Sequence, residues 1–215
     1  MTTLKAALFD LDGTLFDTEG HYSQFWSKVG QRYHPEINDF DQLIKGTTLS
    51  DIMQRYFPDK EMQQDIIHQL YEAERNVRYH FFPGAEEMLH DLRNHGLLLA
   101  LVTSSNRDKM RHVQMQMPHF PQLFDQILTA EDFAHSKPHP DCYLRAAERL
   151  ACTPAECIVF EDAFSGLQAA MTAGMFTFGI ATTHPRQAIE SRCSHVLDSF
   201  QGINYQSISH ILKTH

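Results

Sequence analysis

Short apolar runs of strand length recur along the chain, and turn-forming or charged residues bound each of them. Amphipathic helical patterns occupy several of the gaps between these runs, at residues 108–117, 142–150 and 165–173. Strands that alternate with helices of this length imply βαβ units, a parallel sheet and helices on both faces of the sheet. We therefore predict an α/β fold with strands at residues 4–9, 97–102, 126–128, 158–160, 176–180 and 195–197.

A long segment between the first two strands breaks this alternation. From about residue 18 to residue 80 there is no convincing strand, and the periodicity is helical throughout. The Pro83-Gly84 pair marks the return to the sheet. We expect an all-helical domain at residues 17–82, inserted into an α/β core made of residues 1–16 and 83–215. Its apolar stripe has the spacings of three and four that are typical of a helix packed on other helices, at Met62, Ile66, Ile67, Leu70, Ala73 and Val77.

Charge and composition narrow the range of partners. The 18 lysines and arginines stand against 27 aspartates and glutamates, so the net charge is −9 at pH 7 with the histidines neutral. Without a basic cluster, this balance argues against nucleic acid or an anionic membrane surface as a partner. The longest apolar run, residues 97–102, is far shorter than the roughly 20 residues that cross a bilayer. Since the start of the chain lacks a secretory signal and the four cysteines form no Cys-x-x-Cys pair, we expect a cytoplasmic protein with reduced thiols.

Two acids follow the first predicted strand. Asp10 and Asp12 stand two residues apart, which places both carboxylates on the same side of an extended chain. At the carboxyl end of a parallel strand they would lie in the crevice where α/β proteins bind ligands. A metal or a phosphate is the natural partner for such a pair, although a solvated Asp-Gly turn would give the same pattern.

Three further polar groups follow the later strands. Thr103 and Ser104 lead into a helix whose first N–H groups can bind an anion, although an ordinary helix cap looks the same. Lys137 stands before a proline, where it could hold a phosphate, although most lysines are solvated surface charges. The Glu161-Asp162 pair suits Mg²⁺, although acids are also favoured at the start of a helix. Because all these groups follow strands at the same end of one sheet, we predict that they form one site.

These residues resemble the motifs of the haloacid dehalogenase superfamily, in the subgroup of β-phosphoglucomutase and phosphoglycolate phosphatase, whose helical cap follows the first motif. The first motif, Asp-x-Asp-Gly-Thr-Leu, corresponds to residues 10–15, and the second, a threonine or serine after a hydrophobic strand, to Thr103. The lysine before proline corresponds to Lys137 and the acidic pair to Glu161-Asp162. The resemblance covers nearly the whole chain and implies a parallel, Rossmann-like sheet beneath an all-helical cap.

The resemblance also implies a role for each motif. Asp10 would attack phosphorus and become an aspartyl-phosphate, while Asp12 would protonate the leaving alcohol and then activate the hydrolytic water. Lys137 would neutralise charge, and Thr103 with the N–H of Ser104 would position the phosphoryl oxygens. Carboxylates and, from the second aspartate, a main-chain carbonyl would bind Mg²⁺; the ligands would be Asp10, Asp12, Glu161 and Asp162.

The expected function is hydrolysis of a small phosphorylated metabolite, such as a sugar phosphate, with Mg²⁺ as cofactor. Three alternatives remain open. A phosphosugar mutase would use the same aspartyl-phosphate, a dehalogenase would need neither Asp12 nor Mg²⁺, and a receiver-like module would accept a phosphoryl group on Asp10 as a signal. The intact acid pair weighs against a dehalogenase, and a lid of about 60 residues, which suggests exclusion of water during turnover, weighs against a receiver.

The cap weighs against the mutase. Mutases of this subgroup carry an arginine that binds the distal phosphate, where this chain has Leu49, and a histidine on the first cap helix, where it has Tyr22 beside His21. A bisphosphate would require a guanidinium in the cap. The sequence offers only Lys45 and Arg55 nearby, and the oligomeric state is not readable from it.

Overall fold

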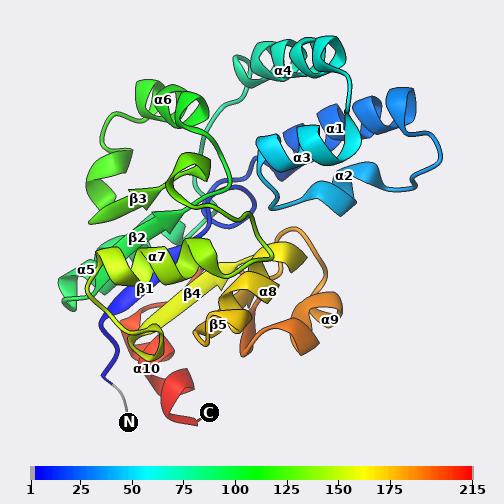
Figure 1. Ribbon diagram of the computed structural model, residues 1–215. Coiled ribbons are helices and arrows are strands. Elements are labelled where there is room, and N and C mark those ends of the chain that lie inside the picture. The colour runs from blue at the N-terminus through cyan, green and yellow to red at the C-terminus, as the bar shows by residue number, and fades with distance from the viewer. Residues whose placement is uncertain (1–2, 215) are drawn as a thin grey trace.

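The structure is a computed structural model that describes residues 3–214 (Figure 1). Its core is a sheet of six parallel strands in the order β3-β2-β1-β4-β5-β6. The strands are β1 (Ala6–Phe9), β2 (Leu98–Val102), β3 (Gln126–Leu128), β4 (Cys157–Glu161), β5 (Phe176–Ile180) and β6 (His195–Leu197). All six predicted strands are present, with ends that differ from the prediction by at most two residues. The predicted α/β class is confirmed.

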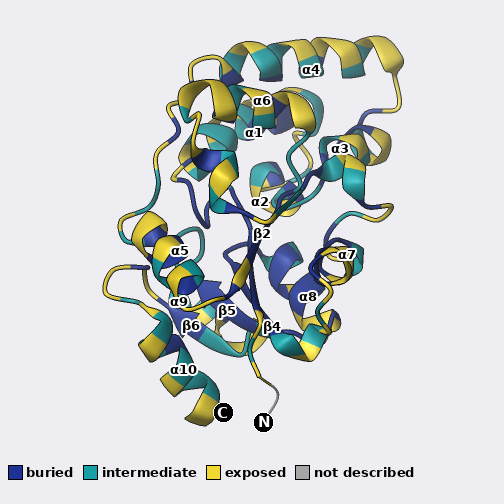
Figure 2. Cartoon of the chain, turned by 90° about the vertical axis from the view of Figure 1, so that its left-hand side faces the viewer, coloured by how far each residue is buried: buried dark blue, intermediate teal, exposed yellow. Residues whose placement is uncertain are grey.

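Helices cover both faces of this sheet (Figure 2). Strand residues alternate in direction, so Phe9 belongs to the hydrophobic cluster of one face and Leu8 to that of the other. The first cluster includes residues of α5 (Ala85–Asn94), α6 (Arg107–Gln116) and α10 (Tyr205–Thr214), and the second includes residues of α7 (Asp141–Arg149) and α8 (Phe164–Thr172). Burial on both faces explains why the strands read as continuous apolar runs. A short helix, α9 (Arg186–Ile189), lies before β6.

Four helices between β1 and α5 pack around a hydrophobic cluster of their own. They are α1 (Glu19–Tyr33), α2 (Phe40–Ile44), α3 (Leu49–Tyr56) and α4 (Lys60–Glu74). In Figure 1 they lie beyond the ends of the strands, as a cap. An isolated bridge pairs Phe16 with Phe81, so the chain leaves and re-enters the core at neighbouring points. These features support the proposed division into a cap at residues 17–82 and a core at residues 1–16 and 83–215.

The apolar stripe predicted for the cap is too long at its end. The helix α4 stops at Glu74, where N–H groups of Asn76 and Val77 bond to carbonyls three residues back and close the last turn. Val77 then packs in the hydrophobic cluster of the sheet rather than in that of the cap. Val77 is apolar because the segment that returns to the core is anchored there, and its position happens to continue the helical spacing of α4.

The strand order sets the place of the site. β1 and β4 are neighbours, yet the chain continues from β1 to β2 on one side and from β4 to β5 on the other. In doubly wound sheets a crevice opens at the carboxyl ends of two such strands, and ligands bind there. The cap helices lie over this end of the sheet (Figure 1).

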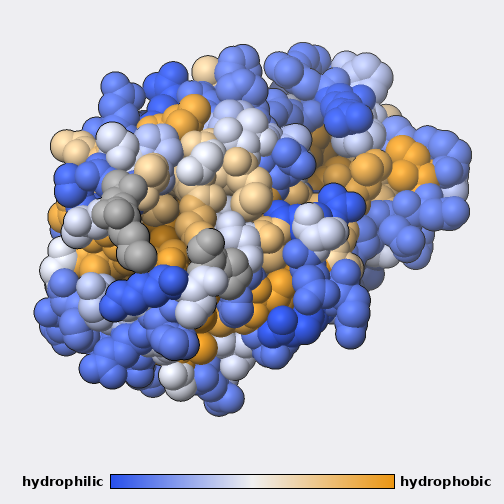
Figure 3. Space-filling view, turned by 90° about the horizontal axis from the view of Figure 1, so that it is seen from below, coloured by the Kyte–Doolittle hydropathy of each residue, from blue (hydrophilic) through white to orange (hydrophobic). Residues whose placement is uncertain are grey.

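Figure 3 shows the molecule from below, where hydrophobic atoms appear between hydrophilic side chains. Large apolar residues that are exposed within residues 3–214 come from different elements, which is ordinary for a protein surface; they are Leu43, Leu98, Met115, Leu144 and Met171. Within the same range, every helix is too short or too polar to cross a bilayer.

Candidate active site

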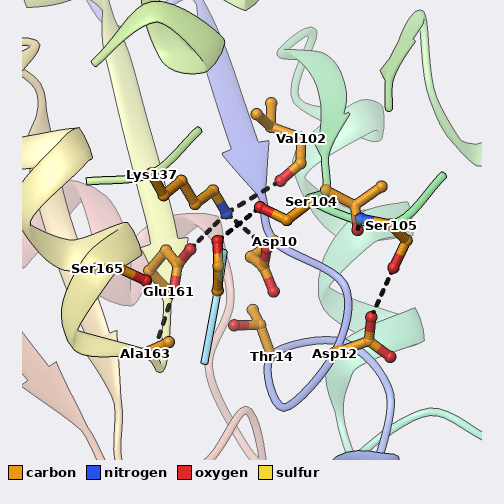
Figure 4. A network of polar contacts seen from close by, with 12 residues as sticks. Asp10, Asp12, Thr14, Val102, Ser104, Ser105, Lys137, Glu161, Ala163 and Ser165 are labelled. Atoms are coloured by element: carbon orange, nitrogen blue, oxygen red, sulfur yellow. Dashed lines mark hydrogen bonds and ion pairs between the residues drawn. The ribbon is translucent and has the colours of Figure 1, made fainter. Parts of the chain in front are cut away.

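The predicted site residues gather at the carboxyl ends of three neighbouring strands. Asp10 directly follows β1, Thr103 directly follows β2, and Glu161 is the last residue of β4. Lys137 comes from the loop between a short 3-10 helix, η2 (Ala130–Asp132), and α7. Figure 4 shows that the side chains of Asp10, Lys137 and Glu161 point toward one another at the ends of the strands.

Lys137 connects two of the predicted acids. Its Nζ donates to Asp10 Oδ1 and to Glu161 Oε1, each at 2.6 Å, and to the main-chain carbonyl oxygen of Val102 at 3.3 Å (Figure 4). Burial alone would lower the pKa of Lys137, but the carboxylates of Asp10 and Glu161 outweigh it and raise this pKa well above its usual value. Lys137 is therefore a fixed positive charge between two carboxylates.

Glu161 is held by donors at both carboxylate oxygens. Its Oε1 accepts from Lys137 and from the Tyr143 hydroxyl at 3.1 Å, and its Oε2 accepts from the main-chain N–H groups of the next two residues at 2.9 and 3.0 Å. A Cβ atom at Gly166 in α8 would lie 1.7 Å from Oε1, so only a glycine lets this helix approach so closely. These contacts fix Glu161 as a support for Lys137.

Asp162 completes a group of three carboxylates. Asp10, Glu161 and Asp162 each contribute one oxygen that lies within 4.8 Å of the other two. The Thr14 hydroxyl donates to Asp162 Oδ1 at 2.6 Å, and the Thr183 hydroxyl donates to Oδ2. Since Lys137 balances one charge only, two negative charges remain when all three acids are ionised.

Burial is the main cause of raised pKa values at two of these acids, and the neighbouring negative charges add to it. Burial raises the pKa of Asp10 to about 8, although Lys137 opposes the shift. Burial and then the charges of Glu161 and Asp10 raise the pKa of Asp162 well above its usual value. A small group of carboxylate oxygens with uncompensated charge suits a hard divalent cation, so the residues present fit Mg²⁺.

Asp12 lines the same cavity as Asp10, although β1 ends at Phe9 and both acids lie in the loop that follows it. The Asp12 carboxylate accepts from Lys109 Nζ at 2.5 Å, from the Thr18 hydroxyl at 2.6 Å and from the Ser105 hydroxyl at 2.9 Å. Burial would raise the pKa of Asp12, but Lys109 and these hydrogen bonds outweigh it and lower this pKa.

Lys109 is a site residue that the sequence analysis missed. It lies in the first turn of α6, is 5% exposed, and holds its Nζ 3.9 Å from the centroid of the Tyr22 ring. A cation in the first turn opposes the helix dipole unless a carboxylate compensates it. This unfavourable position is the feature of the sequence that indicates an acidic partner for Lys109.

Three serines of the core contact the segment that joins α2 to α3. The hydroxyls of Ser104 and Ser165 donate to main-chain carbonyls in residues 45–48, at 2.6 and 2.7 Å, and the Ser136 hydroxyl accepts an N–H there at 2.9 Å. Each serine follows a different strand of the sheet. Together they fasten this part of the cap to the ends of the strands.

Thr103 and Ser104, the predicted phosphate-binding residues, lie beside Asp10. Thr103 is buried and its hydroxyl accepts the N–H of Ser105 at 3.0 Å. Both Thr103 and Ser104 line a cavity between the ends of the strands and the cap. Their placement agrees with a role at the phosphoryl group, while the Ser104 hydroxyl is turned to the cap.

The cavity is lined by both parts of the chain. Its two cations are already paired, because Lys45 donates to Glu19 and, at 2.8 Å, to Ser23, and Lys109 donates to Asp12. Asp10 lines the cavity, whereas Lys137, Glu161 and Asp162 are buried outside its lining. Further lining residues that bear on function come from the cap: Tyr22, Trp26, Asp41, Leu49, Leu70 and Glu74.

The structure shows where the two cap positions lie that the sequence analysis contrasted with those of a mutase. Leu49 and Tyr22 line the cavity, and the Tyr22 hydroxyl donates to Glu74 Oε1 at 3.2 Å. Arg55 lines a separate groove beside Ser136. Within the described chain, the cavity lining therefore contains no arginine.

Comparison with known proteins agrees with this geometry. A family model described as haloacid dehalogenase-like hydrolase matches residues 7–180. The chain is 34% identical over 203 residues to validoxylamine A 7'-phosphate phosphatase of Streptomyces hygroscopicus subsp. limoneus, covering 86% of this chain and 89% of the relative. It is 31% identical over 183 residues to hexitol phosphatase A of Escherichia coli, covering 82% of each. A β-phosphoglucomutase structure from Clostridium difficile shares the fold, with a TM-score of 0.78, 21% identity and coverage of 99% of this chain and 98% of that one.

Proposed function

The chain belongs to the haloacid dehalogenase-like hydrolases, and from that premise we propose that it is a Mg²⁺-dependent phosphatase of a small phosphomonoester, such as a sugar phosphate. Two relatives that match most of its length are named phosphatases. The observation that carries the proposal is the environment of Asp10. Its buried carboxylate lines the cavity and accepts a hydrogen bond at 2.6 Å from Lys137, whose side chain is fully buried.

We assign the Mg²⁺ ligands to Asp10, Asp162 and the main-chain carbonyl of Asp12. Glu161, which the sequence analysis included among the ligands, has four protein donors on its two oxygens and is assigned to hold Lys137 instead. When bound, Mg²⁺ would supply the positive charge that offsets the repulsion between a carboxylate and a phosphate. That repulsion is about 4 kcal/mol for each pair of unit charges at 4 Å.

Asp10 acts as the nucleophile in this proposal. One carboxylate oxygen forms a bond to phosphorus as the bond from phosphorus to the leaving alcohol breaks, which gives an aspartyl-phosphate. Lys137 holds the carboxylate in a fixed orientation during the attack. Thr103 and the N–H of Ser104 contact the phosphoryl oxygens from the loop between β2 and α6.

Asp12 moves the protons. In the arrangement described, Lys109 keeps Asp12 ionised, which suits the second step, when Asp12 takes a proton from the attacking water. To protonate the leaving alcohol in the first step, Asp12 must first gain a proton and loosen its contact with Lys109. Water then attacks phosphorus, and the Asp10 carboxylate and free phosphate are released.

Water, rather than a second hydroxyl of the substrate, is the proposed acceptor. A mutase must hold the distal phosphate of a bisphosphate while the intermediate turns around. The cavity offers no guanidinium for that purpose, and its two lysines, Lys45 and Lys109, are paired with acids. Leu49 stands where the mutases of this subgroup place their arginine.

The test is a panel of phosphorylated metabolites assayed for free phosphate with and without Mg²⁺. It includes β-glucose 1-phosphate with a trace of its bisphosphate, and glucose 6-phosphate is measured in parallel. Rapid release of phosphate from one or a few monoesters supports the phosphatase. Efficient formation of glucose 6-phosphate with little free phosphate would establish the mutase instead, and full activity in a chelator would refute the metal requirement.

Two substitutions separate chemistry from folding. Asp10→Asn removes the nucleophile, and Asp12→Asn removes proton transfer, which is worth roughly 10²–10⁴-fold in rate. Asp17→Asn is the matched control, because Asp17 lies close by in the sequence and its side chain is 59% exposed. Activity in Asp10→Asn close to that of the control would exclude Asp10 as the nucleophile.

A further inference from the structure

The cavity contains a buried acid that the proposed chemistry does not use. Glu74, the last residue of α4, lines the cavity and is 4% exposed. The Tyr22 hydroxyl donates to its Oε1, whereas its Oε2 is buried without a hydrogen-bond partner in the described part of the chain. A buried carboxylate oxygen without a donor is unfavourable, and a ligand that brings a donor removes the penalty.

The charges around Glu74 restrict what that ligand can be. The lysines of the cavity, Lys45 and Lys109, are each ion-paired with another carboxylate. No ion pair joins Glu74 or Asp41, the other unpaired acid of the lining, to a residue within 3–214. The cap side of the cavity therefore presents negative charge to a substrate, with no free cation to receive an anion.

Apolar side chains lie in the same lining. Trp26, Leu49 and Leu70 come from three cap helices and give surface against which carbon atoms can pack. A hydroxyl-rich carbon chain presents both C–H groups for such surfaces and O–H donors for a carboxylate. A second phosphate or a carboxylate would meet the negative charge of Glu74, while the lysines of the lining, Lys45 and Lys109, are paired with other carboxylates.

We propose that Glu74 Oε2 accepts a hydrogen bond from a hydroxyl of the leaving group, and that the substrate is the monophosphate of an uncharged, hydroxyl-rich alcohol. Glu74 is then a specificity-determining residue that also excludes substrates with a second anionic group. The inference rests on the proposed phosphatase function, since it concerns the part of the substrate that departs.

Two compounds test the proposal as a matched pair. Glucitol 6-phosphate and 6-phosphogluconate have six-carbon chains that differ at the first carbon. This carbon belongs to a hydroxymethyl group in glucitol 6-phosphate and to a carboxylate in 6-phosphogluconate. Because hydrogen bonds to a charged acceptor are worth about 1.5–3 kcal/mol, or about ten- to hundredfold, we expect kcat/KM of the wild type to be at least about tenfold higher for glucitol 6-phosphate. Comparable kcat/KM for the two compounds would overturn the proposal.

Substitutions of Glu74 test whether its charge causes the difference in kcat/KM between the two compounds. Glu74→Gln keeps the size of the side chain and removes the charge, so the ratio of the two kcat/KM values should fall several-fold, mainly through KM. Glu74→Asp keeps the charge and should retain more of the ratio. Glu72→Gln, an exposed acid on the same helix, is the control and should leave the ratio unchanged. An unchanged ratio in a folded Glu74→Gln variant would also overturn the proposal.

A third compound separates this inference from the proposed function. Hydrolysis of 4-nitrophenyl phosphate depends on Asp10 and the core but offers no hydroxyl to Glu74. If the wild type hydrolyses it and treats the matched pair alike, the inference about Glu74 is wrong and the phosphatase stands. If the wild type releases phosphate from none of the three compounds, the phosphatase proposal fails and the inference fails with it.

Discussion

Replacing each member of the Glu161-Asp162 pair by its amide should have opposite effects on the protein without metal. The two acids are adjacent in sequence and equally buried, but their partners differ. Four donors point at Glu161, including the Lys137 ammonium. Among residues 3–214, Asp162 accepts only from the hydroxyls of Thr14 and Thr183, which can rotate, and it adds to the surplus negative charge.

The magnitudes follow from these contacts. In Glu161→Gln one carboxylate oxygen becomes an NH₂ group, and whichever oxygen is replaced, that group faces two hydrogen-bond donors. The buried Lys137 also loses one of its two carboxylates. Breaking a buried pair in this way costs about 3–5 kcal/mol, which lowers Tm by about 6–20 °C for a chain of this length. In Asp162→Asn one like charge disappears and the hydroxyls can reorient, so the free energy of unfolding without metal should be unchanged or higher.

The assay is thermal unfolding in chelator and in excess Mg²⁺. A ligand at 100 times its Kd adds about 2.7 kcal/mol to the free energy of unfolding, so the wild type should gain several degrees with Mg²⁺. Asp162→Asn should lose most of that gain, because it lacks a metal ligand. Glu148→Gln, an exposed acid on α7, is the control and should behave as the wild type. The reasoning is refuted if Asp162→Asn lowers Tm in chelator as much as Glu161→Gln does.

Three further changes probe other parts of the site. Because the pKa of Asp10 is raised to about 8, protonated Asp10 contributes fully to the free energy of unfolding below its ordinary pKa near 3.8, and this contribution is lost as pH rises through about 8. In chelator, the Tm of the wild type should therefore fall more than that of Asp10→Asn between about pH 6 and pH 9. Equal decreases in Tm would contradict the raised pKa. Gly166→Ala places a Cβ 1.7 Å from a carboxylate oxygen and should cost about 1–3 kcal/mol, whereas Gly20→Ala, with nothing within 4 Å, should not; thermal unfolding of both variants decides. Ser104→Ala combined with Ser165→Ala removes two hydrogen bonds between core and cap, each worth about 0.5–1.5 kcal/mol. It should raise KM roughly tenfold and lower Tm by about 2–12 °C; an unchanged KM would show that these contacts do not hold the cap over the substrate.

The central strands β1, β2 and β4 could be predicted closely because they are buried on both faces and nearly all of their residues are apolar. The helices at residues 108–117, 142–150 and 165–173 are present with a shift of one residue toward the amino terminus. Three helices of the described core, α5, α9 and α10, are absent from the prediction, although Met88, Leu89 and Leu92 of α5 have helical spacing. The end of α4 was missed because Val77 continues the spacing of the cap while packing on the core.

The composition of the site was predictable where topology alone brings residues together. Asp10, Thr103 and Glu161 each stand at the end of a strand, and parallel strands place those ends at one edge. The contact between Lys109 and Asp12 joins residues that are 97 positions apart, and it depends on how the start of α6 faces the loop after β1. No local pattern encodes that distance, and the same holds for Glu74, whose burial depends on how the cap rests on the core.

The distribution of cations divides the site into two parts that favour different ligands. Lys137 balances one of three carboxylates, so the region of Asp10 and Asp162 keeps surplus negative charge, which a divalent cation can use. Toward the cap, Lys109 and Lys45 each balance one carboxylate, and no cation is left for a second anion. A phosphate can then bind where metal charge is available, and the rest of the substrate lies where only neutral donors are stabilised. The same arrangement favours transfer to water, because an alcohol without a second phosphate has no charged group by which a lysine or arginine of the cavity could retain it after the first step.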